Sequence, residues 1–152
     1  MTDRPSPNQR QDYPHMVSMQ TRWQDNDIYG HVNNAVYYAF FDKIVNDFLI
    51  EKNLIDIHQK DISKPVGLVV ETGCHFFAPI AYPQMIDVGL RVQHMGNSSV
   101  HYEIGVFASK ADADNDDAIA QGKFVHVYVD AQTRRPVALS DLFRNEIATL
   151  TK

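Results

Sequence analysis

The sequence predicts a single α+β domain in which a curved antiparallel sheet wraps around one long central helix. The helix is predicted by an apolar run with helical spacing over residues 34–51. Its aromatic side chains fall on more than one face and therefore need cover on several sides. The sheet is predicted by short runs that alternate between apolar and polar residues and are separated by turn residues. The chain of 152 residues is long enough for one domain with a hydrophobic core and too short for two to be expected.

The first part of the chain divides into a tail and a strand. Residues 1–14 are rich in Pro, Gln, Asn and Asp, so we expect a flexible amino-terminal tail and place the folded domain at residues 15–152. Residues 16–23 alternate well enough to predict the first strand of the sheet. This strand leads directly into a polar break in the chain.

The polar break, at residues 24–33, separates the first strand from the long helix. Asn33 and Asn34 are good N-cap residues, so the helix is predicted to begin there and to fade near residue 51. Residues 54–65 mix charged and apolar side chains and predict a helix end followed by a connector.

The rest of the chain is predicted to be mostly β structure. Four further strands are expected, at residues 67–77, 86–93, 100–106 and 118–129. Gly96 and Asn97 form a turn signal between two of these strands. Ser140 has the character of an N-cap and predicts a short terminal helix that ends near residue 150.

Composition restricts the classes of partner and location. The net charge of −5 gives no reason to expect nucleic-acid binding, although a local basic patch could still bind a phosphorylated ligand. The single cysteine, Cys74, excludes an intrachain disulfide and a cysteine-based zinc site, and its apolar surroundings indicate a buried, inert thiol. No apolar run approaches membrane-spanning length, and the amino end lacks a signal core. We therefore expect no membrane association and a cytoplasmic location.

The polar break carries the residues best suited to chemistry. It contains two carboxylates, Asp25 and Asp27, together with His31 and a glycine, Gly30, that permits a positive-φ turn or a close ligand approach. The break opens onto the amino end of the predicted helix, where unpaired N–H groups and the positive end of the helix dipole face the loop. A carboxylate in this position can attack or activate water while the N–H groups hold a developing oxyanion.

This stretch resembles a known signature. The pattern D-x-D-x-x-G-H-V-N-N-x-x-Y runs from Asp25 to Tyr37 and is followed by Phe40-Phe41-Asp42. It is similar to the motif of the hotdog-fold acyl-CoA thioesterases of the 4-hydroxybenzoyl-CoA thioesterase type. The resemblance implies the hotdog fold and hydrolysis of an acyl-CoA thioester to a free acid and coenzyme A. It implies no metal or redox cofactor, since coenzyme A takes part as a portion of the substrate.

The resemblance also implies an assembly and a set of site residues. It implies a homodimer whose sheets join edge to edge, with active sites at the subunit interface, or a tetramer. Asp27 is the expected catalytic carboxylate because it is the second aspartate of the pair and lies three residues before the glycine. His31 and the backbone N–H near Asn34 complete the expected catalytic group. The residues expected to bind substrate are Asp25, Tyr29, Gly30, Asn33, Tyr37, Ser98, Ser99 and Arg134.

Several roles stay open at this point. Asp27 could attack the thioester carbonyl or activate a water, and it could instead only cap a turn. His31 could polarise the carbonyl, or it could bond a backbone carbonyl and do no chemistry. Asp25 is expected to support the loop by accepting backbone hydrogen bonds, and Tyr37 to form core or pocket wall rather than act as a catalyst.

The far end of coenzyme A needs cations and hydroxyl or backbone donors. Residues 96–99, Gly-Asn-Ser-Ser, resemble the family's Gly-x-Ser-Ser turn, which meets the nucleotide. The cations near the same strand ends are Arg91, Lys123, Arg134 and Arg135. In one departure from the family, Phe41-Asp42-Lys43-Ile44-Val45 stands where many members have Phe-Glu-x-Ala-Arg, so the resemblance assigns no acyl group.

Three rival interpretations are tested by spacing. Asp25, Asp27 and His31 could be metal ligands, but no further ligand is evident nearby. The hotdog enoyl-CoA hydratases have Asp followed five residues later by His, whereas here His31 follows the two aspartates by four and six residues. The acidic loop at residues 112–117 imitates the start of an EF-hand, but Asp117 replaces the required Gly and Lys123 the bidentate Glu.

Two functional alternatives remain beside hydrolysis of free acyl-CoA. The chain could hydrolyse acyl groups that are carried by a protein, or it could bind acyl-CoA without turning it over. The sequence does not choose among acyl chain lengths or between aromatic and aliphatic acyl groups.

Overall fold

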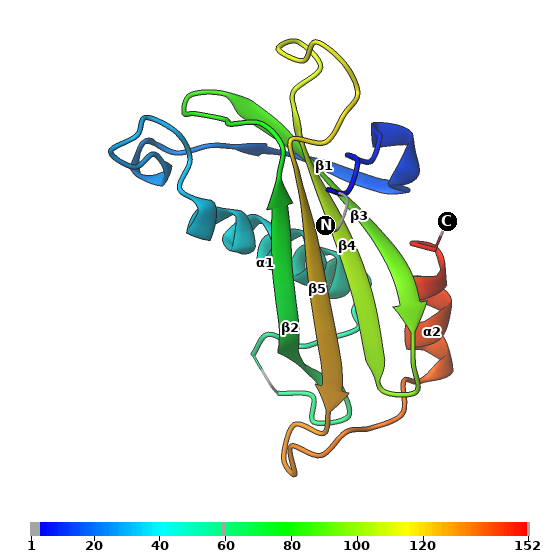
Figure 1. The fold of residues 1–152 in the computed structure, drawn as a ribbon. Helices are drawn as coiled ribbons and strands as arrows, with labels where there is room; N and C mark the ends of the chain where they lie inside the picture. The colour runs from blue at the N-terminus through cyan, green and yellow to red at the C-terminus, as the bar shows by residue number, and fades with distance from the viewer. Residues whose placement is uncertain (1–3, 59, 152) are drawn as a thin grey trace.

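One long helix lies against the inner face of a five-stranded sheet (Figure 1). The computed structural model describes residues 4–58 and 60–151. The helix α1 is Asn34–Glu51, and a short helix α2, Asp141–Ala148, closes the chain. The strands are β1 (His15–Gln20), β2 (Val66–Phe76), β3 (Met85–Met95), β4 (Ser99–Ala108) and β5 (Ala120–Val129).

The strands form one antiparallel sheet in the order β1-β3-β4-β5-β2. The first two strands in the sequence, β1 and β2, are therefore its two edges. Figure 1 shows the sheet curving around α1, and the predicted α+β architecture is confirmed. In the described ranges, neither helix is long and apolar enough to cross a membrane.

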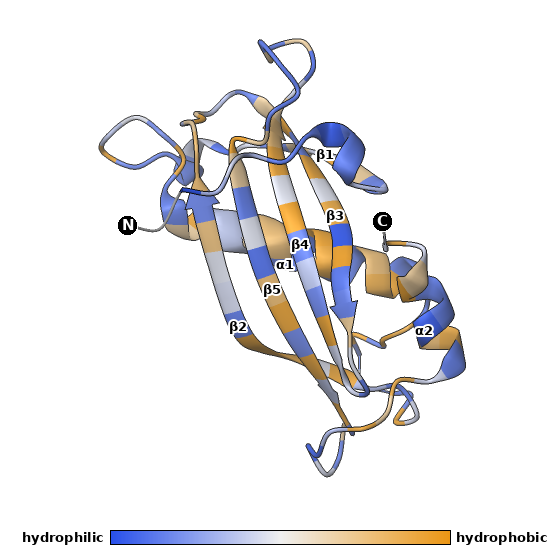
Figure 2. Cartoon of the chain, turned by 45° about the vertical axis from the view of Figure 1, so that its right-hand side comes forward, coloured by the Kyte–Doolittle hydropathy of each residue, from blue (hydrophilic) through white to orange (hydrophobic). Residues whose placement is uncertain are grey.

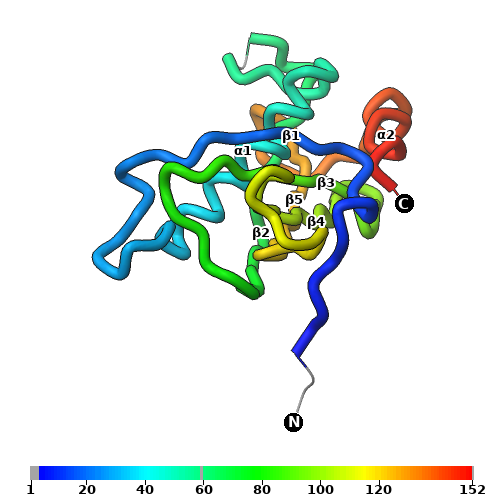
Figure 3. Tube along the Cα trace, turned by 90° about the horizontal axis from the view of Figure 1, so that it is seen from above, coloured from blue at the N-terminus to red at the C-terminus, as the bar shows by residue number. Residues whose placement is uncertain are grey.

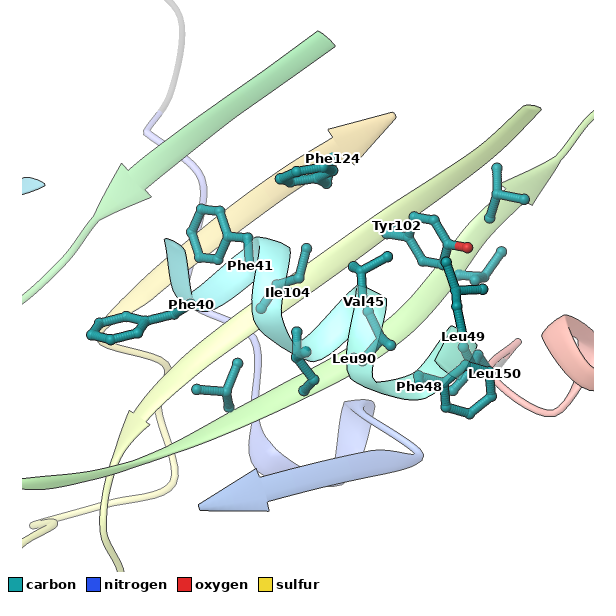
Figure 4. Close-up of a cluster of buried hydrophobic side chains, with 14 of the residues drawn as sticks. Phe40, Phe41, Val45, Phe48, Leu49, Leu90, Tyr102, Ile104, Phe124 and Leu150 are labelled. Atoms are coloured by element: carbon teal, nitrogen blue, oxygen red, sulfur yellow. The ribbon is translucent and has the colours of Figure 1, made fainter. Parts of the chain in front are cut away.

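The helix begins where its N-cap chemistry predicts. The side-chain oxygen of Asn33 accepts a hydrogen bond from the Ala35 N–H, at 2.9 Å, and so satisfies one of the free donors of the first turn. The buried side chains of α1 are Tyr37, Phe40, Phe41, Ile44, Val45, Phe48 and Leu49. Figure 2 shows the apolar middle of the helix behind the sheet, and Figure 4 shows its side chains meeting those of Leu90, Ile104 and Phe124.

A glycine in the sheet lies in close contact with the helix. A Cβ atom added to Gly122 in β5 would lie 2.4 Å from the ring of Phe41, which is fully buried in α1 and cannot move aside without disturbing the core. Gly122 therefore sets the distance between the helix and this strand.

Gly122→Ala is expected to lower the free energy of unfolding by about 1–3 kcal/mol, because the added methyl overpacks the core. Gly73→Ala in β2 is the matched control, since an added Cβ there meets nothing within 4 Å. Urea denaturation of both variants at one protein concentration checks this. Equal midpoints for the two variants would contradict the expected overpacking.

Two sequence-predicted boundaries are wrong. The first strand ends at Gln20, not Trp23, because residues Trp23–Asp25 form a 3-10 turn whose end is tied back to Arg22 through the Asp25 carboxylate. The second wrong boundary is the helix end that was expected within residues 54–65. The helix already ends at Glu51, and the described residues 54–58 and 60–65 contain turns and no helix.

Part of the predicted amino-terminal tail is seated on the outer face of the sheet. Residues 1–3 lie outside the described range. Arg10 forms an ion pair with Asp87 at 2.7 Å, and the buried ring of Tyr13 packs edge-on against Phe107. This ring fits because Gly89 and Gly105 have no Cβ, which would lie 2.7 and 2.6 Å from it. The packing of Tyr13 thus extends the ordered outer layer ahead of β1.

Strand β2 is an exposed apolar edge. It pairs with β5 on one side only, and its large side chains Leu68, Val69 and Val70 are exposed. The pairing shifts register between Val69 and Glu71, so Val70 is an extra residue in a bulge. An exposed edge of this kind leaves backbone groups and apolar surface available for another chain.

Candidate active site

The polar loop at residues 26–33 is anchored to the segment between β2 and β3. The Val32 N–H donates to the carbonyl of Ile80 at 2.7 Å, and the Tyr82 N–H donates to the side-chain oxygen of Asn26 at 3.0 Å. Figure 3 looks down on this end of the sheet and shows the blue loop beside the green segment. The loop is therefore held at the end of the sheet where β2 finishes and β3 begins.

Asp25 forms hydrogen bonds within the loop. Its carboxylate is buried and accepts hydrogen bonds from the backbone N–H of Arg22 at 2.8 Å and from the guanidinium of the same residue. Its carbonyl accepts from the Asn33 N–H at 2.9 Å. The supporting role expected for Asp25 stays a prediction, and these contacts with Arg22 and Asn33 are the hydrogen bonds through which it would hold the loop.

Asp27 is fixed relative to the start of α1. One carboxylate oxygen accepts from the Tyr29 N–H at 2.8 Å, and the other accepts from the Asn33 side-chain amide at 3.3 Å. The Asp27 carbonyl accepts from the N–H of Gly30, which closes a turn in which Gly30 takes a φ of +82°. Because the Asn33 oxygen also caps α1, one side chain sets both the carboxylate and the helix end.

The amino end of α1 leaves donors facing the loop. Within the described residues, the backbone N–H of Asn34 donates to no protein acceptor. Such N–H groups, together with the helix dipole, favour negative charge at this position. The arrangement therefore combines a carboxylate with a free oxyanion donor.

A cavity of about 300 Å³ opens beside this helix end. Its wall comes from the loop, the first turns of α1 and the end of β2. The lining residues are His31, Val32, Asn34, Tyr37, Phe76, Phe77, Ala78 and Pro79. Asp27 is not one of them, but its backbone N–H donates to the carbonyl of the lining residue His31 at 3.0 Å, so the Asp27 backbone adjoins the cavity wall.

Two predicted residues that line the cavity, His31 and Tyr37, differ in their exposure to solvent. His31 is exposed, and in the described structure its ring makes no hydrogen bond. Tyr37 is buried, with edge-to-face contacts to Phe40 and Phe76 at 5.9 and 5.0 Å between ring centroids. Burial raises the pKa of Tyr37 to about 12, because the ionised phenolate would lose its hydration there.

The remaining predicted residues lie elsewhere. The backbone N–H of Tyr29 contacts Asp27, but its side chain is 80% exposed and does not line the cavity. Ser98 and Ser99 lie at the turn between β3 and β4, and Arg134 lies in the turn after β5, where it takes a φ of 61°. Both turns stand at the lower end of the sheet in Figure 1, while the loop stands at the upper end. Within one chain, the structure does not bring these three residues to Asp27.

Two parts of the site went unpredicted. Phe76 and Phe77 form a cavity wall, although the sequence marks them only as the end of a strand. Arg4, in the predicted tail, donates a hydrogen bond to the Phe76 carbonyl, and its guanidinium lies 5.4 Å from the centroid of the Phe77 ring. The adjacent aromatic pair before Pro79 is the one sequence signal that could have pointed to this wall.

Among the residues that the structure describes, no three His, Cys, Asp or Glu side chains are grouped so that they could hold a metal ion. Asp25 is engaged with Arg22, and Asp27 with the Tyr29 and Asn33 donors.

Comparisons with known proteins identify the family and the fold of this chain. The Thioesterase-like superfamily matches the chain over residues 21–147. The solved structure of the PA5185 protein from Pseudomonas aeruginosa shares 47% identity over 97% of this chain and 98% of its own, with a TM-score of 0.87. Among curated proteins, no sequence matches the chain.

Two further solved structures carry functional descriptions. A thioesterase from Thermus thermophilus, complexed with coenzyme A and Zn, shares 27% identity over 91% of this chain and 95% of its own, with a TM-score of 0.70. A 1,4-dihydroxy-2-naphthoyl-CoA thioesterase from Synechocystis shares the fold at 15% identity and a TM-score of 0.75, over 88% of this chain and 94% of its own. With its loop, central helix and wrapped sheet, the chain belongs to the Thioesterase-like superfamily and has the hotdog fold.

Proposed function

We propose that this protein hydrolyses acyl-CoA thioesters to a free acid and coenzyme A, with Asp27 as the catalytic carboxylate. The observation that carries the proposal is the double use of Asn33, whose amide holds Asp27 while its oxygen caps α1. The carboxylate and the free Asn34 N–H are thereby fixed to the same helix end. The related Thermus thermophilus thioesterase, which is complexed with coenzyme A, supports a ligand of this type.

The thioester carbonyl oxygen would accept a hydrogen bond from the Asn34 N–H, which stabilises the oxyanion as the carbonyl carbon is attacked. In one route the Asp27 carboxylate attacks, the C–S bond breaks and coenzyme A leaves as the thiolate. Water then hydrolyses the mixed anhydride to the free acid and restores the carboxylate. In the other route, Asp27 takes a proton from a water that attacks the carbonyl directly, the C–S bond breaks, and coenzyme A leaves as the thiolate and regains a proton. His31 lies at the mouth of the cavity, where it can contact the thioester.

The assembly proposed for this activity is a homodimer joined through β2. Antiparallel pairing of two copies of this edge would cover the exposed Leu68, Val69 and Val70 and remove the open strand edge. In such a pairing the two sheets run in opposite directions. The sheet end of the second copy that holds Ser98, Ser99 and Arg134 would then lie on the same side of the dimer as the polar loop of the first copy. Dimerisation would therefore bring together predicted residues that one chain holds apart.

Val70→Asp is expected to break the dimer, because it buries a charge at the paired edge. Val70 is 60% exposed in the single chain, so the substitution should cost the folded subunit little. Ile62→Asp is the matched control, since Ile62 is 59% exposed but lies off the sheet. Light scattering coupled to size exclusion is expected to give a dimeric mass for the wild type and the control and a monomeric mass for Val70→Asp. A wild type that elutes as a monomer would contradict the proposed assembly.

The activity is tested by following thiol release from a panel of short, long and aromatic acyl-CoA thioesters. Turnover of at least one class at a rate above the uncatalysed reaction is the expected result. The same acyl groups presented on a carrier protein form the second arm of the experiment. Turnover there and not on coenzyme A would replace the proposed substrate. Binding of acyl-CoA without turnover on either carrier would overturn the enzymatic proposal.

A further inference from the structure

Tyr37 places a hydroxyl group without a protein partner at the active-site cavity. The residue is 3% exposed and forms part of the cavity wall. Within the described residues, its phenolic oxygen makes no hydrogen bond. The only described side-chain nitrogen or oxygen that is both fully enclosed and unpartnered is Arg10 Nε, so the Tyr37 oxygen is not sealed in the core. It therefore keeps some accessible surface, and the Tyr37 side chain lines the cavity.

The other buried tyrosines all have partners. The hydroxyl of Tyr13 accepts from Asn8 at 3.1 Å and donates to Glu103 at 3.3 Å. The hydroxyls of Tyr102 and Tyr128 bond each other at 2.7 Å. Buried phenols normally find a partner, so the exception at Tyr37 needs a cause. A ligand that brings its own polar atom into the cavity supplies one.

The ring of Tyr37 is held in position. Phe40 meets it at an interplanar angle of 69°, and Phe76 meets it at 89°. These flanking rings come from α1 and from β2, so they clamp the phenol between the helix and the sheet edge. The hydroxyl is thus a positioned donor, and burial raises the pKa of the phenol still further above neutral pH.

The burial of the cavity residues indicates which part of a substrate meets Tyr37. His31 and Asn34 are exposed, whereas Tyr37, one helical turn beyond Asn34, is buried. A thioester carbonyl that accepts from the Asn34 N–H would lie at the mouth. The acyl group then extends inward, between the aromatic walls, toward the phenol.

We propose that Tyr37 determines acyl specificity by donating a hydrogen bond to an oxygen on the acyl group beyond the thioester. This inference rests on the proposed thioesterase function. The favoured substrates are acyl groups that carry a hydroxyl, keto or phenolic oxygen, and an unsubstituted acyl group would leave the phenol unpaired. Leaving a buried donor unpaired corresponds to about a 10- to 100-fold loss of kcat/KM.

The test compares Tyr37→Phe with wild type on matched thioesters. The pairs are benzoyl-CoA with 4-hydroxybenzoyl-CoA, and butanoyl-CoA with 3-hydroxybutanoyl-CoA and acetoacetyl-CoA. Wild type is expected to favour an oxygen-bearing member of at least one pair by about 10-fold or more, and Tyr37→Phe is expected to abolish that preference. Tyr38→Phe is the control, because Tyr38 is the neighbouring half-buried tyrosine and does not line the cavity.

Three results would overturn the inference. These are a wild type without preference in any pair, a preference that survives Tyr37→Phe, and an equal loss on both members of every pair. The last would follow if the phenol bonded a second copy of the chain instead of the acyl group. Failure of the thioesterase proposal is recognised separately, as an absence of thiol release from every substrate. The same comparison is then made by calorimetry with non-hydrolysable thioether analogues of the pairs, and equal affinities would reject the role of Tyr37.

Discussion

Asp27→Asn is expected to lower kcat by about 10²- to 10⁴-fold, the range in which a positioned acid or base contributes to catalysis. The amide keeps an oxygen that can accept from the Tyr29 N–H, so the loop should hold its shape. It cannot form the mixed anhydride or take a proton from water. The substitution therefore removes the chemistry and retains the geometry. Thiol-release kinetics, together with coenzyme A affinity from calorimetry, check this.

Asp42→Asn is the control, because Asp42 is an exposed carboxylate on α1 that lies away from the cavity. It is expected to keep wild-type kcat. Unchanged turnover in Asp27→Asn would remove Asp27 from the mechanism while leaving the enzyme. If the acid is essential, mass spectrometry of the acid-quenched reaction separates the two routes, since an acyl adduct on Asp27 forms only in nucleophilic catalysis.

A pH-dependent loss of stability is expected from His126. The imidazole is 2% exposed, and the rings of Phe124, Tyr102 and Tyr128 surround it at 5.1, 5.5 and 5.6 Å between centroids. Its Nδ1 shares a hydrogen bond with the Tyr128 hydroxyl at 3.0 Å. Burial lowers the pKa of His126 to about 4, because the protonated ring would lose its hydration in the core.

The sign of the effect follows from proton binding. The unfolded chain protonates His126 below a pKa of about 6.5, whereas the folded chain does so only below about 4. The unfolded state therefore binds more protons between these values. The free energy of unfolding falls as the pH drops from about 6.5 to about 4, by about 3 kcal/mol in all.

His126→Gln tests this expectation, since glutamine is polar at every pH and does not titrate. Urea denaturation from pH 7 to pH 4 should show a steeper loss of stability in the wild type than in the variant. Carboxylates titrate in both proteins, so the difference between the two curves isolates His126. Parallel curves would contradict the prediction, whatever the absolute stability of the variant.

Local patterns in the sequence determined where the helices and strands form and which reactive side chains the polar loop carries. The helical spacing and the Asn33 cap predicted α1 over residues 34–51, which the structure confirms as Asn34–Glu51. The alternation in residues 86–93 predicted β3, whose alternating side chains Ile86, Val88, Leu90 and Val92 are buried. Spacing and capping involve residues a few positions apart, so they can be read without knowing the fold. The motif likewise placed a carboxylate pair next to a helix end.

Only the tertiary structure decided which residues share a site and which surfaces stay open. Strand order made β2 an edge and brought Phe76 and Phe77 to the cavity beside Tyr37. It also set Ser98 and Arg134 at the opposite end of the sheet from Asp27. Because Gly89 and Gly105 have no Cβ, the Tyr13 ring can pack on the sheet and hold part of the predicted tail there. These outcomes depend on contacts between segments far apart in the chain, and no local period encodes the order in which strands pair.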